Sequence, residues 1–167
     1  LQNSQLAVEY LLNSADVSFL GNQTFPDGSA LYQPQELSHM ADVKAVVQRA
    51  LLAWYFLFAI ILAGGIWGWQ RHWFSSFLIA LSRGGGLTLA LIAAALVGVF
   101  SDFSELFTRF HQIFFKDGTW TFLFSDTLIR LFPLRFWQDA FIFAGVFAFV
   151  CGLLLAFGGA YLSKKVD

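Results

Sequence analysis

The chain has 167 residues, of which 57% are hydrophobic, 19% are aromatic and only 13% are charged. A soluble domain usually carries about a quarter charged residues, so roughly half of that complement is missing here. This composition excludes a disordered chain, the single cysteine excludes a disulfide scaffold, and a net charge of −1 gives no sign of nucleic-acid binding.

The amino-terminal segment, residues 1–49, is predicted to fold rather than to form a simple loop. Apolar residues at helical spacing predict a short amphipathic helix that ends at Leu12. The sequence Phe25–Gly28 is typical of a turn. Residues 39–49 are predicted to continue as a helix into the first apolar stretch of the chain.

Three stretches contain no charged residue and no proline: residues 50–70, 84–101 and 140–163, with 21, 18 and 24 residues. As helices they would be roughly 27 to 36 Å long, compared with a hydrocarbon core of about 30 Å in a bilayer. We therefore predict an all-α, polytopic bundle of transmembrane helices, with residues 1–167 forming a single integral membrane domain. The glycine pairs at residues 64–65 and 158–159 are predicted to allow close helix packing rather than to bind a ligand, whereas the glycine triplet at residues 84–86 opens a span and lacks the lysine of a phosphate-binding loop.

The distribution of basic residues predicts the orientation. Residues 71–83 and 164–167 hold four lysines and arginines in 17 positions, whereas residues 1–49 and 102–139 hold six in 87 positions, with ten of the eleven acids. The side dense in basic residues is predicted to be cytoplasmic, so the two long segments face outward. Because the chain begins at Leu1 with a long outer segment, we expect a further upstream span that is absent from this sequence, which would make four spans.

The second outer segment, residues 102–139, is predicted to form a helical cap. Phenylalanines recur at helical spacing over residues 102–115, which predicts a strongly amphipathic helix at the membrane interface. A second short helix is predicted over residues 127–132, with Asp126 in position to cap it.

Histidines are the main candidates for chemistry. His39 and His111 lie in the two outer segments, whereas His72 lies at the inner end of a span and is predicted to be an interfacial anchor. The two outer histidines either share a site or are separate, hydrogen-bonded structural residues. Asp42, three positions after His39, can orient that imidazole or be solvated at a helix start; Asp126 can orient a histidine or cap a helix.

No nucleophile motif is present, and the single cysteine, Cys151, lies in the middle of a span. Two histidines and a carboxylate from distant segments can hold a metal ion, so a metal-dependent membrane hydrolase that uses His39 and His111 is one alternative. A non-catalytic membrane subunit whose cap packs on a partner is another. A shared site requires the fold to bring His39 and His111 together.

Two blocks of residues resemble a known family. The first is FTRFHQIFF at residues 107–115, followed by Trp120 and by DTLIRLFP at residues 126–133. The second is ELSHMADV at residues 36–43, just before the first span. In their order and in their position relative to the predicted helices, these blocks resemble the bacterial lipoprotein intramolecular transacylase (Lit) family, and the resemblance covers nearly the whole chain.

This resemblance implies an enzyme of the bacterial plasma membrane with four transmembrane helices and with its active site at the outer, extracytoplasmic face. We expect no metal or other cofactor. The implied reaction moves the sn-2 acyl chain of a diacylglyceryl-cysteine lipoprotein to the α-amino group of the cysteine, which gives a lyso-form lipoprotein. The implied partners are the lipoprotein substrate and membrane lipids, without nucleic acid.

The resemblance also assigns roles to residues. His39 and His111 correspond to the catalytic pair, and Asp42 and Asp126 match motif positions only. An orienting role for these two aspartates is our own expectation. An α-amino group with a pKa of about 7.7–8.0 must lose a proton to attack an ester, and a histidine with a pKa of about 6.5 is suited to accept it. Apolar walls for the acyl chain are expected from Phe110, Phe115 and Trp120.

Overall fold

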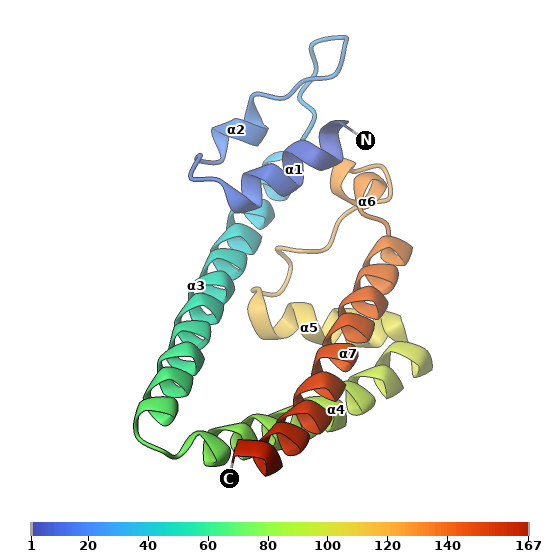
Figure 1. The fold of residues 1–167 in the computed structure, drawn as a ribbon. Helices are drawn as coiled ribbons and strands as arrows, with labels where there is room; N and C mark the ends of the chain where they lie inside the picture. Colours follow the sequence, from blue (N-terminus) through green and yellow to red (C-terminus); the bar gives the residue numbers. More distant parts are fainter. Residues whose placement is uncertain (1, 167) are drawn as a thin grey trace. The chain divides into compact units, whose positions relative to one another are not determined.

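The computed structural model describes residues 2–166, which contain seven α-helices and no β-strand (Figure 1). The helices are α1 (Gln2–Leu12), α2 (Ser18–Gly21), α3 (Pro34–Gln70), α4 (Phe74–Ser101), α5 (Phe103–Phe114), α6 (Thr127–Leu131) and α7 (Leu134–Val166). The chain divides into two compact units. Unit 1 contains the residues up to Ala53 and Ser104–Trp137, and unit 2 contains Trp54–Phe103 and the residues from Gln138 onward.

Three helices, α3, α4 and α7, are long and apolar enough to cross a membrane. They have 37, 28 and 33 residues, and at most 11% of each apolar window is buried within the protein. Exposed apolar surface of this extent is suited to lipid rather than to water. The predicted all-α fold with three spans is therefore confirmed. Helix α4 begins well before the predicted start at residue 84, because Arg83 ends the charge-free stretch but does not interrupt the helix.

Helix α3 ends in a tight turn that leads directly into α4. His72 has a φ of 59°, and the Trp73 amide donates a hydrogen bond to the carbonyl of Gly68 at 3.0 Å. This is the hydrogen-bond pattern of a Schellman cap, in which the residue after the helix adopts a left-handed conformation. The Trp73 ring packs on Trp67 at 5.8 Å between centroids, so the turn carries the aromatic residues expected near a membrane interface.

In unit 2, α4 and α7 pack against each other through small residues (Figure 1). A Cβ atom on Gly85 would lie 2.5 Å from the backbone nitrogen of Ala156, and one on Gly159 would lie 2.7 Å from the carbonyl oxygen of Leu78. The Ser82 hydroxyl donates a hydrogen bond to the Ala156 carbonyl at 2.6 Å. The predicted close packing at the pair 158–159 is confirmed at Gly159, and Gly85 makes an equally close contact that was not predicted.

Unit 1 has a conventional buried core beside the start of α3. Its members come from α1, α2, the segment before α3, α3 itself and α6: Ala7, Tyr10, Leu20, Leu31, Tyr32, Met40 and Leu128. The predicted helix ending at Leu12 and the predicted turn are both confirmed, the latter with Gly28 at a φ of 84°. The predicted cap helices are also confirmed, as α5 and α6.

A buried lysine joins the loop after α1 to α3. Lys44 is only 8% exposed, and its ammonium donates hydrogen bonds to the side chain of Asn13 and the carbonyl of Ala15. The same ammonium lies 4.0 Å from the centre of the Tyr10 ring, a cation–π contact. These contacts fix the folded amino-terminal segment on the part of α3 that precedes the charge-free stretch.

Candidate active site

The first turn of α3 is held by a buried carboxylate, Glu36, which is 1% exposed. Gln33 stands before Pro34, the first helical residue. The backbone N–H of Gln33 donates a hydrogen bond to Oε2 of Glu36 at 2.7 Å, as in a capping box. The other carboxylate oxygen accepts a hydrogen bond from the Leu128 amide at 2.6 Å, in the first turn of α6. One side chain therefore caps two helices and joins the start of α3 to α6.

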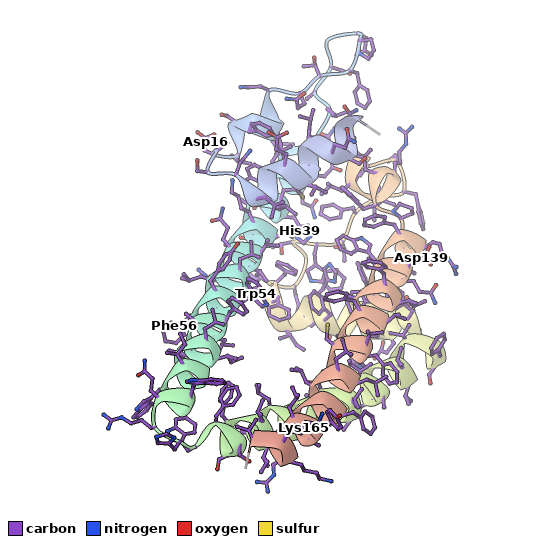
Figure 2. The ribbon with its side chains drawn as sticks, viewed as in Figure 1. Asp16, His39, Trp54, Phe56, Asp139 and Lys165 are labelled. Atoms are coloured by element: carbon purple, nitrogen blue, oxygen red, sulfur yellow. The ribbon has the colours of Figure 1, made fainter. Side chains whose placement is uncertain are left out.

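The two candidate histidines, His39 and His111, lie together in unit 1. His39 lies in the second turn of α3 (labelled in Figure 2) and His111 in α5, and their ring centroids are 5.9 Å apart, with the planes inclined by 23°. Both are buried, with 7% and 9% of the residue exposed. The requirement for a shared site, that residues far apart in the sequence meet, is fulfilled.

The two imidazole rings differ in their hydrogen-bond partners. Nδ1 of His111 lies 2.8 Å from the carbonyl oxygen of Phe107, one turn earlier in α5. A carbonyl oxygen can only accept a hydrogen bond, so Nδ1 of neutral His111 carries the proton. Nε2 then keeps a lone pair that can accept a second proton. Nδ1 of His39, in contrast, is buried without a hydrogen-bond partner among the described residues.

Burial keeps both imidazoles neutral. Loss of solvation, and secondarily the nearby His111, lowers the pKa of His39 from 6.5 to about 4. Burial also lowers the pKa of His111, and the hydrogen bond to the Phe107 carbonyl partly opposes that shift. Near neutral pH both rings can accept a proton, and a proton on one ring disfavours a proton on the other.

Aromatic side chains enclose the histidine pair. His39 packs against Phe115 and Phe122, with centroids 4.9 and 5.4 Å away. His111 contacts four rings at 4.1 to 5.8 Å: Phe107, Phe110, Phe115 and Trp120. We call these five residues (Phe107, Phe110, Phe115, Trp120 and Phe122) the aromatic shell. The three predicted lining residues, Phe110, Phe115 and Trp120, all belong to it.

The two predicted orienting aspartates do not hydrogen bond to the histidines in the described part of the chain. Asp42 shares the predicted face of α3 but its side chain is exposed, whereas His39 turns inward. Asp126 stands at the start of α6, yet its carboxylate accepts a hydrogen bond from the Leu123 amide at 2.8 Å and makes no capping bond to the helix. The prediction that Asp126 caps α6 is wrong, because the Glu36 carboxylate accepts the hydrogen bond from the Leu128 amide in the first turn of α6.

Several contributors were not apparent from the sequence. Gln35, one turn before His39, donates from its side-chain amide to the carbonyls of Gly118 and Thr121, both at 3.1 Å. These bonds hold the loop on either side of Trp120. The glutamate three positions after Gln33 was a detectable capping signal, whereas nothing local marks Gln35 or Phe122.

The residues around the pair give no support to a metal centre. Within residues 2–166, no three or more histidine, cysteine, aspartate or glutamate side chains are grouped so that they could hold a metal ion. The nearest buried carboxylate along α3, Glu36, is already bonded to two backbone amides. The geometry therefore does not favour the metal-dependent hydrolase.

Known proteins share this fold and sequence pattern. The family model described as lipoprotein intramolecular transacylase Lit matches residues 1–137. A protein of Aquifex aeolicus (strain VF5), described as uncharacterized, is 27% identical over 165 residues, which is 99% of this chain and 73% of that protein. The in meso structure of the membrane integral lipoprotein intramolecular transacylase Lit from Bacillus cereus has a TM-score of 0.59 and 22% identity, over 99% of this chain and 75% of that one. The structural similarity shows the fold, and the family match over most of the chain shows that this protein belongs to the Lit family.

Proposed function

We propose that this membrane enzyme, a lipoprotein intramolecular transacylase by family, moves the sn-2 acyl chain of a diacylglyceryl-cysteine lipoprotein to the α-amino group of the same cysteine. We further propose that His39 and His111 carry out the proton transfers. The observation that supports this most directly is the pair of buried, neutral imidazoles whose centroids are 5.9 Å apart inside the aromatic shell.

His111 is the proposed base. Its Nδ1 is engaged by the Phe107 carbonyl, so Nε2 is the nitrogen that accepts the proton of the attacking amine. The amine nitrogen then bonds to the ester carbonyl carbon, and a tetrahedral intermediate forms. When it collapses, the bond between that carbon and the glycerol oxygen breaks, and the protonated His111 returns its proton to this oxygen.

His39 has a different proposed role. Its lowered pKa makes it a weak base, which suits a neutral hydrogen-bonding partner better than a proton acceptor. Its Nδ1 has no hydrogen-bond partner among residues 2–166, and a hydrogen bond from it to the departing glycerol oxygen would satisfy this buried atom. His111 then carries the proton from the amine to the glycerol oxygen, and His39 stabilises that oxygen as it departs.

No covalent acyl-enzyme is needed in this scheme. The amine and the ester belong to one molecule, so holding it in a folded conformation supplies the proximity that a nucleophilic residue would otherwise provide. The shell of aromatic side chains offers apolar walls for the acyl chain and excludes water, which would compete with the amine for the ester.

The proposed site lies at the outer face of the plasma membrane. The excess of lysine and arginine around the α3–α4 turn and the carboxyl-terminal tail supports a cytoplasmic position for those parts. The amphipathic character of α5, with His111 on its buried face and Ile113 exposed, supports a position at the interface with lipid.

Mass spectrometry of a reporter lipoprotein tests this proposal. Since the transfer is intramolecular, substrate and product have equal mass, so the assay must read fragment ions and the loss of a free α-amine to an amine-reactive label. We expect N-acylation with the wild-type protein, a loss of at least about 100-fold in His111→Gln and His39→Gln, and no change in the matched control His72→Gln. Unchanged diacylglyceryl-cysteine with the wild type would refute the function, and release of free fatty acid would indicate a hydrolase.

A further inference from the structure

Three buried polar side-chain atoms have no hydrogen-bond partner in the described part of the chain: the Tyr32 hydroxyl, Nδ1 of His39 and the indole nitrogen of Trp120. Leaving such an atom unpaired costs about 1–3 kcal/mol, so each needs an explanation. The proposed mechanism uses the one on His39. The indole nitrogen of Trp120 belongs to a ring whose centroid lies 4.9 Å from that of His111, and nothing so far uses it.

The chemistry of an indole restricts what its partner can be. The N–H of tryptophan donates a hydrogen bond and cannot accept one, so only an oxygen or another acceptor can satisfy it. Every other member of the aromatic shell is a phenylalanine and carries no polar atom. Trp120 is thus the one residue of the shell that can donate to a substrate oxygen.

The position of Trp120 is also held from both sides. The side-chain amide of Gln35 binds the carbonyls of Gly118 and Thr121, which flank Trp120 in the loop between α5 and α6. Gln35 lies one turn before His39, so the helix that carries one histidine also anchors the loop that carries the indole. A hydrogen-bond donor held in this way costs little reorganisation when charge develops near it.

We infer that the Trp120 indole N–H binds the carbonyl oxygen of the ester and stabilises the oxyanion of the tetrahedral intermediate; this inference rests on the proposed function. When the amine nitrogen bonds to the carbonyl carbon, the electron pair of the C=O bond moves to the oxygen, which accepts the hydrogen bond. When the intermediate collapses, that pair re-forms the C=O bond and the glycerol oxygen leaves with the proton from His111. Because the indole nitrogen is buried, the bond forms after the substrate parts the aromatic side chains.

A near-isosteric replacement tests the N–H alone. Exchanging Trp120 for 3-benzothienylalanine puts a sulfur in place of the N–H and keeps the bicyclic ring, and Trp120→Phe gives a second, encoded variant. The same exchanges at Trp137, which packs on Phe107 at 6.2 Å in the same unit, are the matched control. We expect kcat to fall about 100-fold at Trp120 with KM changed less than about threefold, and both constants to be retained at Trp137. An unchanged kcat, or a raised KM alone, would mean that Trp120 only lines the site and would overturn the inference.

A measurement that needs no turnover separates this inference from the proposed function. A lipid with a phosphonate in place of the sn-2 ester presents a tetrahedral, anionic oxygen, and its addition to ¹⁵N-labelled protein in nanodiscs is expected to shift the Trp120 indole proton downfield. The shift should persist in the inactive variant His111→Gln. An indole resonance that the phosphonate leaves unmoved would overturn the inference, even if the enzyme transfers acyl chains. Failure of the wild type to N-acylate a lipoprotein would instead refute the proposed function.

Discussion

Glu36→Gln is expected to loosen the start of α6 while leaving the long helices intact. The buried carboxylate accepts hydrogen bonds from two backbone amides, at 2.7 Å from Gln33 and 2.6 Å from Leu128. A hydrogen bond to a charged acceptor contributes about 1.5–3 kcal/mol, and glutamine keeps only one acceptor oxygen. One amide would then face an NH₂ group, so we expect a loss of about 2–3 kcal/mol in the local stability of unit 1.

Hydrogen–deuterium exchange of peptides from α6, measured in detergent micelles, reads this loss directly. At about 1.4 kcal/mol for each factor of ten, exchange in the first turn of α6 should accelerate about 30- to 140-fold. Glu105→Gln is the matched control, because Glu105 is exposed and its bond to Arg109, an i,i+4 pair, contributes about 0.5 kcal/mol or less. Equal protection of α6 in Glu36→Gln and the wild type would refute the view that this carboxylate joins α3 to α6.

Three further predictions concern pH, the buried lysine and the helix contact in unit 2. Because burial lowers the pKa of His39 from 6.5 to about 4, the folded state disfavours its charged form, so stability is retained above about pH 6.5 and lost as the pH falls toward 4. The expected loss is on the order of 3 kcal/mol; a melting temperature of the wild type that varies with pH no more than that of His39→Phe would contradict it. Lys44→Met removes a buried ammonium from two oxygen acceptors and should lower stability in thermal unfolding by about 2 kcal/mol. The exposed control Lys116→Met should change stability by less than about 0.5 kcal/mol. Equal losses in the two variants would argue against the buried contact. Gly85→Ala places a Cβ 2.5 Å from a backbone nitrogen and should destabilise the packed pair of α4 and α7 by about 1–3 kcal/mol. Gly86 has open space around it, so Gly86→Ala should stabilise α4 by up to about 1 kcal/mol. A Gly85→Ala variant as stable as the wild type in thermal unfolding would refute the close packing.

The aromatic surroundings of the histidines have a consequence for the pH dependence of the proposed reaction. Since burial lowers the pKa of both imidazoles, the group expected to limit the rate on the acid side in the proposed mechanism is the substrate amine, with a pKa of about 7.7–8.0. A site that desolvates its base in this way deprotonates the substrate more readily when it also desolvates the amine, because burial lowers the pKa of an ammonium group. In the proposed mechanism the aromatic shell provides that environment for both groups.

Local patterns in the sequence were enough to predict most of the helical architecture. The spans followed from runs of apolar residues, because a helix that crosses the hydrocarbon core needs about 20 consecutive, predominantly apolar residues wherever it packs. The helix α5 followed from the spacing of its phenylalanines, and His39 and His111 were identified as candidates through short motifs. Helix limits were less accurate: a charge such as Arg83 ends an apolar stretch but not a helix, so α4 began earlier than predicted.

Contacts between segments were decided only by the tertiary structure. The capping of α6 by Glu36 instead of Asp126, the bonds from Gln35 to the loop and the exposed position of Asp42 all depend on which segments pack together. A carboxylate or an amide binds whichever donor or acceptor the fold brings within about 3 Å, and helical spacing predicts partners only within one helix. The sequence by itself thus determined the membrane spans, the helices and the two candidate histidines. The fold decided that these histidines meet, that one of them has a fixed tautomer, and that beside it lies an indole N–H with no hydrogen-bond partner in the described part of the chain.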